Sequence, residues 1–493
     1  MNYIPLIGLE IHVQLSTKTK LFCSCARKVN QDIYGTDVAA NMTICPICLG
    51  LPGAMPYMNE EAVEKALRVG LGLNCETNSL SIWDRKNYMY PDLFTGYQIS
   101  QMEQALNLTG YVEISNKKIR INRAHLENDA AKSLHVGGNT LLDANKSGVP
   151  LVEIVSEPDM RNADEAKEYA EKVQQIVRWI DASDADMFMG EMKFDINVSL
   201  CVEGDPEKDG LSGIKHTPIV EVKNRNSFKE LYDVINYEIK RQTEEYEKTG
   251  VLYTKGSKVT MGWDEVKGAT FLQREKEEAD DYRYFHEPDV PPFVMTDEFL
   301  NRVKSTMPKP MDEVIKEIVD KYKSDVRRVS SLVGDRNLYA FFLECQKLNA
   351  DYSKQYIDWI MSDINNILTT SQQDISEVNL QPKTLIDIIT NVEKNILNRG
   401  TGHDILVEFI EGNLSGKSVE EIINERGLAK VSDTGFIEEL VKNAIVTNPK
   451  VVEDIKSGKD SAKMFIVGVV MRESKGKADV AVVREILDRL LTA

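Results

Sequence analysis

Residues 7–15 read IGLEIHVQL, and this stretch decides how the first part of the chain is built. Apolar and polar residues alternate along it, which predicts a β-strand because successive side chains of a strand point to opposite faces. One face of this strand is apolar. The other carries Glu10, His12 and Gln14, so three polar functional groups share one side of the strand.

Two further segments alternate in the same way. Residues 111–127 predict a hairpin, with strands YVEIS and IRINRAHLE joined around residues 116–118, and the period of two places His125 and Glu127 on one face. Residues 193–200 (KFDINVSL) alternate again. Strands of this kind are typical of antiparallel sheets with one apolar and one polar face.

Helices are predicted between these strands. Asn162 has the side chain of a helix N-cap and precedes apolar residues at spacings of three and four. Ser227 followed by Glu230 forms a capping-box pattern ahead of a second helix, and Gly250 is its expected end. The front part of the chain is therefore expected to be α+β.

The chain is expected to divide into three parts. The proline-rich segment 286–293 (HEPDVPPF) ends the strand alternation, which predicts a boundary near residue 295, and residues 398–402 (NRGTG) read as a linker. We expect an α+β cradle domain with a mixed or antiparallel sheet over residues 1–294, an all-α helical domain over 295–400, and an all-α tail over 401–493.

The composition is that of a soluble globular protein. The chain has 493 residues, of which 28% are charged and 42% hydrophobic. It lacks an apolar stretch of about 18 residues and a signal peptide, so we expect a cytoplasmic protein with no membrane segment. A net charge of -18 argues against a protein that coats nucleic acid without specificity.

A local basic stretch lies near the C-terminus. It is either a solvated helix face or a phosphate-binding surface. Its members are Lys456, Lys459, Lys463, Arg472, Lys475 and Lys477.

Four of the seven cysteines are clustered, as C-S-C at 23–25 and C-P-I-C at 45–48. Two close thiol pairs joined by a loop are what a tetrahedral structural zinc site requires. The hypothesis of a zinc knuckle formed by Cys23, Cys25, Cys45 and Cys48 competes with a redox pair and with unliganded thiols. The three remaining cysteines are expected to be small buried hydrophobes.

The polar strand faces suggest a second metal site. Glu153 lies in the apolar segment 149–155, where a carboxylate is costly to bury unless it is paired or bound to a metal. Oxygen ligands with one imidazole suit Mg²⁺ or Mn²⁺, although exposed faces and salt bridges explain many such residues. Walker, GxGxxG and GxSxG motifs are absent, so ATP would need an unfamiliar site.

Six segments, in this order, resemble signature motifs of the B subunit of the aspartyl/glutamyl-tRNA amidotransferases. They are LIGLEIHVQLSTKTKLFCSC, ICPICLGLPGAMP, DRKNYMYPDLFTGYQISQ, SGVPLVEIVSEPD, VEVKNRNSFKEL and KEEADDYRYFHEPDVPP. The segments SVEEIINERGL and NPKVVEDIKSGKDSAKMFIVGVVMRESKGKAD resemble the small helical tRNA-binding domain of that family. The resemblance covers nearly the whole chain.

The resemblance implies a ligase component that uses ATP and Mg²⁺ to phosphorylate the side-chain carboxylate of mischarged Glu-tRNA(Gln) or Asp-tRNA(Asn). Ammonia from a partner amidase (glutaminase), the A subunit, then displaces the phosphate, and a small C subunit completes a heterotrimer. By the same resemblance Glu10, His12 and Glu127 are catalytic, and Glu10, His12, Glu127 and Glu153 hold Mg²⁺. It also implies that Lys132, Lys146 and Lys193 contact ATP, that the cysteine cluster holds structural zinc, and that the basic tail binds tRNA.

The chain departs from the family motifs at several positions. Asn128, Ala131 and Ala144 stand where the family has Glu, Gly and Tyr, and Lys146 and Lys193 stand where it has Arg. An ammonium cannot make the bidentate phosphate contact of a guanidinium. Two alternatives therefore remain: a paralogue acting on another aminoacyl-tRNA or carboxylate, and a non-catalytic tRNA-binding protein.

Overall fold

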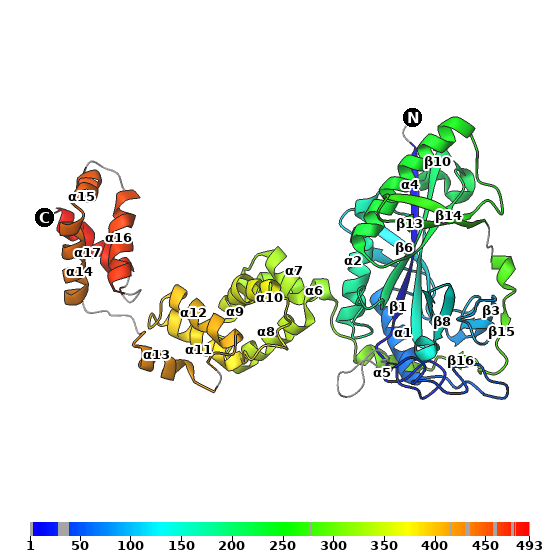
Figure 1. The fold of residues 1–493 in the computed structure, drawn as a ribbon, viewed down its shortest axis with the longest axis horizontal. Coiled ribbons are helices and arrows are strands. Elements are labelled where there is room, and N and C mark those ends of the chain that lie inside the picture. Colours follow the sequence, from blue (N-terminus) through cyan, green and yellow to red (C-terminus); the bar gives the residue numbers. More distant parts are fainter. Residues whose placement is uncertain are drawn as a thin grey trace. The chain divides into compact units, whose positions relative to one another are not determined.

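The computed structural model describes residues 3–27, 39–275, 279–414, 416–428, 434–456, 461–474, 478 and 480–492 (Figure 1). The chain forms two compact units, Met1–Pro310 and Met311–Ala493. Strands belong to the first unit, and the second is helical. These features confirm the predicted α+β class. No helix in the described part of the chain has both the length and the apolar character needed to cross a membrane.

The first unit contains both strands and helices. Its strands are β1 (Ile4–Gln14), β2 (Leu80–Ser81), β3 (Asp84–Asn87), β4 (Tyr97–Ser100), β5 (Gly110–Glu113), β6 (Lys118–Asn128), β7 (Lys132–Val136), β8 (Asn139–Asp143), β9 (Pro150–Ser156), β10 (Met192–Glu203), β11 (Lys215–His216), β12 (Val220–Arg225), β13 (Val259–Asp264), β14 (Ala269–Glu275), β15 (Phe285–His286) and β16 (Phe293–Val294). Its helices are α1 (Glu60–Gly72), α2 (Ala163–Trp179), α3 (Pro206–Asp209), α4 (Phe228–Thr249) and α5 (Asp297–Ser305), with 3₁₀ turns η1 (Ala144–Lys146), η2 (Leu211–Gly213) and η3 (Ala279–Tyr282).

A nine-stranded sheet organises this unit, in the order β14-β13-β12-β10-β1-β9-β6-β5, with β11 paired to β10. In the described residues its strands pair antiparallel, except β12 with β13, which are parallel. The alternation of residues 7–15 is confirmed, because Ile7, Leu9 and Ile11 are buried while the polar residues between them lie on the other face. The apolar face packs against α1, α2 and α4 in one core.

The predicted helix ends are also confirmed. The Asn162 side chain accepts a hydrogen bond from the Glu165 N–H at the start of α2. The Ser227 hydroxyl accepts from the N–H groups of Lys229 and Glu230 at the start of α4. Gly250 ends α4 with φ +65°, a backbone conformation that favours glycine.

The predicted boundary near residue 295 lies too early, because α5 belongs to the first unit. Val303 of α5 is fully buried in the core of that unit. Arg302 pairs with Glu60 of α1 at 2.5 Å, and Arg68 donates to the Thr306 hydroxyl at 2.6 Å. Loss of strand alternation therefore did not mark the end of the folded unit.

The second unit is a series of helices. They are α6 (Met311–Tyr322), α7 (Val326–Gly334), α8 (Arg336–Leu348), α9 (Ser353–Trp359), a π-helical turn η4 (Ile360–Ile364), α10 (Asn365–Ser371), α11 (Pro382–Glu393), α12 (Arg399–Ile410), α13 (Val419–Arg426), α14 (Thr434–Thr447), α15 (Pro449–Lys456), α16 (Ser461–Glu473) and α17 (Val480–Thr492). Helices α14 to α17 share a small core of their own.

The linker predicted at residues 398–402 is instead the start of α12. The Asn398 side chain accepts a hydrogen bond from the Thr401 N–H and caps this helix. Gly402 is buried close to Trp359 and Val392, so its lack of a side chain allows close packing. Both α12 and α13 pack on α11, which places the predicted break at residue 400 inside a packed group of helices.

Candidate active site and metal centre

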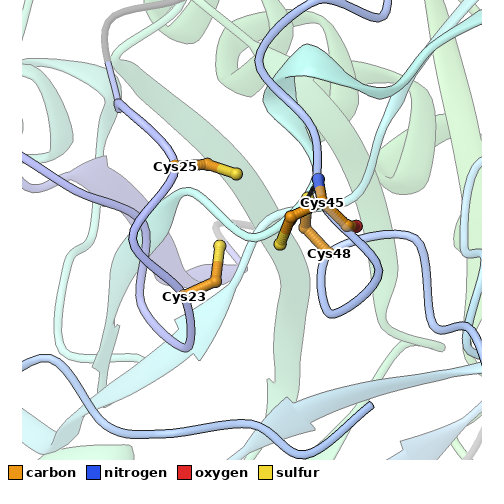
Figure 2. A group of neighbouring side chains, drawn as sticks. All are labelled: Cys23, Cys25, Cys45 and Cys48. Atoms are coloured by element: carbon orange, nitrogen blue, oxygen red, sulfur yellow. Dashed lines mark hydrogen bonds between the residues drawn. The ribbon is translucent and has the colours of Figure 1, made fainter. Parts of the chain in front are cut away.

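Four thiols converge in the first unit. Figure 2 shows the pair Cys23 and Cys25, in the segment after β1, facing the pair Cys45 and Cys48 from a second loop. All four Sγ atoms lie within 4.8 Å of one another. The Sγ atoms of Cys45 and Cys48 are 3.8 Å apart, which matches the separation of about 3.8 Å that tetrahedral ligands at about 2.3 Å from zinc impose.

The second thiol pair is held by polar contacts to the body of the unit. The Cys45 N–H donates to Cys48 Sγ at 3.1 Å, and the Ser147 hydroxyl donates to the Cys48 carbonyl at 2.7 Å. The fully buried Lys20 lies with its Nζ 3.8 Å from Cys48 Sγ. A hydrogen bond from Cys23, the Cys45 N–H and the Lys20 charge lower the pKa of Cys48 below its usual range, which favours the thiolate, the form that binds metals.

A second cluster lies on the polar face of the sheet. His12 of β1 is the cross-strand partner of Glu153 of β9, which in turn opposes His125 of β6. His12 Nε2 lies 3.4 Å from a Glu153 oxygen and 3.7 Å from a Glu127 oxygen. One ligand atom from each of His12, Glu127 and Glu153 falls within 4.8 Å of the others. The two carboxylates are buried, and the three side chains bring together the kinds of atom that can bind a metal ion.

The charged groups of this triad shift one another's pKa values. Burial and the nearby Glu153 charge raise the pKa of Glu127 to about 7. Burial opposes protonation of His12, but the hydrogen bond to Glu153 and the surrounding carboxylates raise the pKa of His12 to about 10. Burial lowers the pKa of His125 to about 3, so His125 is neutral. The positive charges of His12 and Lys86 therefore face the carboxylates of Glu127 and Glu153, and a metal ion bound by His12 would take the place of its proton, because imidazole binds metals in its neutral form.

Glu10 shares the face but does not join the triad. Its carboxylate accepts a hydrogen bond from the Asn197 side chain at 3.0 Å. Burial and the charges of Glu153 and Glu221 raise the pKa of Glu10. Glu10 lines a neighbouring cavity of about 190 Å³ together with His125, Glu221 and Lys258.

Two of the three lysines predicted to contact ATP line a cavity beside the triad. A cavity of about 260 Å³ is lined by His12 and Glu127 and also by Lys146 and Lys193. Lys146 pairs with Asp129 at 2.6 Å, and burial with the charge of Lys146 lowers the pKa of Lys193. Lys132 is exposed on β7 and does not line this cavity.

Two lysines that sequence reasoning missed link the two cavities. Lys86 of β3 and Lys223 of β12 line both of them. Burial lowers the pKa of Lys86, but the charges of Glu127 and Glu153 have the larger combined effect and raise this pKa well above its ordinary value. Alternation in residues 220–225 (VEVKNR) was a usable signal for Lys223, since it places Glu221 and Lys223 on one face. The segment around Lys86 shows no such alternation, and only its resemblance to a family motif marked it.

The residues that depart from the family motifs have structural partners here. Asn128 ends β6 and accepts a hydrogen bond from the Ile99 N–H at 2.7 Å. The Ala131 N–H donates to the Asp92 carbonyl at 2.9 Å. Ala131 and Ala144 are buried, so neither small side chain is exposed to a substrate.

The basic tail is described only in part. Lys456 lies at the end of α15, Lys463 of α16 pairs with Asp488 at 2.9 Å, and Arg472 is exposed on α16. Lys459, Lys475 and Lys477 lie outside the described residues.

Together, the buried acidic cluster and the thiol cluster on the first unit, and the helices of the second, define a protein of two units with its candidate site in the first. A family model described as the GatB/GatE catalytic domain matches residues 5–301, and another, described as the GatB domain, matches residues 340–491. The chain therefore belongs to the family of aspartyl/glutamyl-tRNA(Asn/Gln) amidotransferase B subunits.

Full-length relatives agree with this assignment. The B subunit of the aspartyl/glutamyl-tRNA(Asn/Gln) amidotransferase of Thermotoga petrophila is 40% identical over 501 residues, which cover 100% of this chain and 99% of the relative. Those of Persephonella marina and Clostridium beijerinckii are each 38% identical and cover 100% of both chains. The family predicted from the motifs is confirmed, and the amidotransferase is supported over the two alternatives.

Proposed function

We propose that this chain carries out the ATP-dependent amidation step of a glutamine-dependent tRNA amidotransferase. Its substrate is the side-chain carboxylate of Glu-tRNA(Gln), Asp-tRNA(Asn) or both. The observation that carries the proposal is the cavity in which His12 and Glu127, two members of the triad, meet the ammonium groups of Lys86 and Lys193, while Glu153 lies 3.4 Å from His12 and lines the neighbouring cavity. A cation site next to ammonium groups fits the transfer of a phosphoryl group.

The chemistry has two steps. A carboxylate oxygen of the aminoacyl side chain attacks the γ-phosphorus of ATP, the bond to the bridging oxygen breaks, and ADP leaves. Ammonia then attacks the acyl carbon, the bond from this carbon to the phosphate oxygen breaks, phosphate leaves, and the nitrogen loses a proton. Phosphorylation is needed because a carboxylate is a poor electrophile whose oxygen is a poor leaving group.

His12, Glu127 and Glu153 would hold Mg²⁺. Glu10, whose carboxylate accepts a hydrogen bond from Asn197, would add negative charge beside the ion. When bound, Mg²⁺ supplies positive charge that neutralises the phosphoryl oxygens. Lys146 and Lys193 would orient the ATP phosphates from the wall of the cavity, and Lys132, which is exposed on β7 and does not line the cavity, would reach them from outside it. Lys86 would hold the incoming carboxylate between the two cavities.

The remaining assignments complete the proposal. Cys23, Cys25, Cys45 and Cys48 would hold a structural zinc, since four thiol ligands leave no position for water. The basic residues of the tail, including Arg472, would contact the tRNA backbone. A partner amidase would supply ammonia, and a small third protein would complete a heterotrimer.

The test is amidation of Glu-tRNA(Gln) and Asp-tRNA(Asn) by the purified complex with ATP, using glutamine or free ammonia as the nitrogen donor. We expect ATP-dependent formation of Gln-tRNA or Asn-tRNA from either donor. A complex that binds both tRNAs but forms no amide with free ammonia would show that this chain does not carry out amidation.

A further inference from the structure

Four tyrosines form a row beside the two cavities. In order they are Tyr90, Tyr88, Tyr282 and Tyr284, and neighbouring ring centroids are 5.8, 6.0 and 6.0 Å apart. Each neighbouring pair packs edge to face, at interplanar angles of 65° to 75°. In each edge-to-face pair the edge of one ring covers one face of the other, so three of the four ring faces of the pair are not covered by that contact. We call these four residues the tyrosine row.

The row joins two segments that are far apart in sequence. Strand β3 pairs with β15, with Arg85 opposite Phe285. The Asn87 side chain donates to the carbonyls of Tyr282 and Arg283, at 3.2 and 2.8 Å. These contacts fix the relative positions of Tyr88 and Tyr282, so the row is built into the fold.

The position of the row links it to the reacting groups. Tyr88 lines the cavity of His12 and Glu127, whereas Tyr282 and Tyr284 line the cavity of Glu10. Lys86 lines both cavities, and its Nζ lies 5.0 Å from the centroid of the Tyr282 ring. Tyr90 is 47% exposed at the other end of the row. The row therefore leads from solvent to the site of phosphoryl transfer.

We propose that the tyrosine row is a stacking platform for the adenine ring of a bound adenosine nucleotide. Aromatic rings next to lysines bind unpaired nucleotides, because every base presents a π-face and every linkage a phosphate. The proposal rests on the proposed function, which brings two adenosines here: the 3′-terminal nucleoside of the tRNA and ATP. The terminal nucleoside is favoured, since it carries the aminoacyl ester and must lie within one nucleotide of the reacting carboxylate.

The test uses the complete complex and two fluorescent probes. One is tRNA(Gln) with 2-aminopurine in place of the 3′-terminal adenine, and the other is 2-aminopurine riboside triphosphate in place of ATP. Stacking quenches 2-aminopurine, so wild-type protein should quench one of the two. Tyr88→Leu and Tyr284→Leu should weaken binding of that probe roughly 5- to 100-fold and restore its fluorescence. Tyr88→Phe and Tyr284→Phe keep the ring and should bind as wild type.

Tyr111→Leu is the matched control, because Tyr111 also has a lysine over its ring, Lys118 at 4.1 Å, but lies on β5 at the edge of the sheet. It should bind both probes normally. Tyr90→Ala is a further variant. Because Tyr90 is half-exposed, this change tests the row even if the leucine substitutions at Tyr88 and Tyr284 prevent folding.

The outcomes separate this proposal from the proposed function. If the leucine variants lose binding and quenching of the tRNA probe, the terminal adenosine is the base that stacks on the row. If they lose those of the triphosphate probe, the base is that of ATP. Either result supports the platform. Normal affinity and quenching of both probes in the leucine variants, or no quenching by wild-type protein, overturns it. Amidation by wild-type complex with free ammonia is measured separately, so failure of the platform leaves that function standing.

Discussion

His12 and Glu153 are direct cross-strand partners on β1 and β9, with His12 Nε2 3.4 Å from a Glu153 oxygen. Two adjacent central strands of the sheet thus fix two of the three proposed Mg²⁺ ligands, and β6 supplies Glu127. Because side chains alternate between faces, a slip of one residue in this register would move the ligands to the apolar face. The geometry of the site is therefore set by the register of the sheet.

Glu127→Gln should abolish phosphorylation of the aminoacyl carboxylate while the fold, the zinc content and tRNA affinity stay unchanged. The amide keeps the shape of the side chain but removes the charge that a hard cation requires. Loss of the ion removes several kcal/mol of charge stabilisation, so we expect amidation to fall roughly a thousandfold. The measurement is amidation with free ammonia, which bypasses the partner amidase.

Glu113→Gln is the matched control for that experiment. Glu113 is an exposed carboxylate on β5 that pairs with Lys118 at 3.0 Å. Exposed pairs of this kind contribute little to stability, and Glu113 lies away from the triad, so this variant should amidate at the wild-type rate. Near-normal turnover by Glu127→Gln in the same assay would remove the Mg²⁺ assignment.

The sequence predicted those site residues that lie on strands with alternating polar and apolar residues. The period of two placed Glu10, His12 and Glu127 on polar faces, and the structure brings His12 and Glu127 together. Alternation along single strands does not determine which strands are neighbours, so the separation of Glu10 from the triad was not predictable. Lys86 reaches the site from a three-stranded sheet formed by β15, β3 and β4, which local pattern could not place there.

The domain boundaries were less predictable for a related reason. Glycines at 400 and 402 were interpreted as a linker, but Gly402 is a packing position and α12 continues through it. Likewise α5 follows the last strand, yet its Val303 completes the core of the first unit. Both errors arise because tertiary packing, which a single sequence does not show, overrides local turn signals.

Cys45→Ser should lower the zinc content and the stability of the chain together. The loss of a structural metal is one of the few single changes that cost more than about 4 kcal/mol. Metal analysis of freshly purified protein should find about one zinc in wild type and much less in the variant. Cys201→Ser makes the same chemical change at a buried cysteine of β10 and should leave zinc content intact. Zinc-free wild-type protein of full stability would exclude a structural zinc.

Gly402→Leu should destabilise the second unit. A Cβ atom at Gly402 would lie 3.0 Å from a Val392 methyl and 3.1 Å from the Trp359 ring, so a larger side chain overpacks the site, at a cost of about 1–3 kcal/mol. Gly400→Leu in the same helix is the control, since its Cβ would meet only the Asn398 side chain, at 3.4 Å. Thermal unfolding of both variants gives the comparison. Equal stability of the two would indicate that residues 398–402 form a loose linker after all.

Ending the chain at Leu428 should weaken tRNA binding more than it weakens amidation at saturating tRNA. This truncation removes α14 to α17, whose separate core allows the rest of the chain to keep its own packing. Each phosphate contact that is lost should also make the salt dependence of binding shallower by about one unit in the slope of log K against log salt. Within the full chain, Arg472→Ala should reduce affinity, whereas Glu473→Ala, at the neighbouring exposed position of α16, should not. Filter binding of tRNA at several salt concentrations measures both quantities. An unchanged affinity and slope after truncation would show that the tail does not contact tRNA.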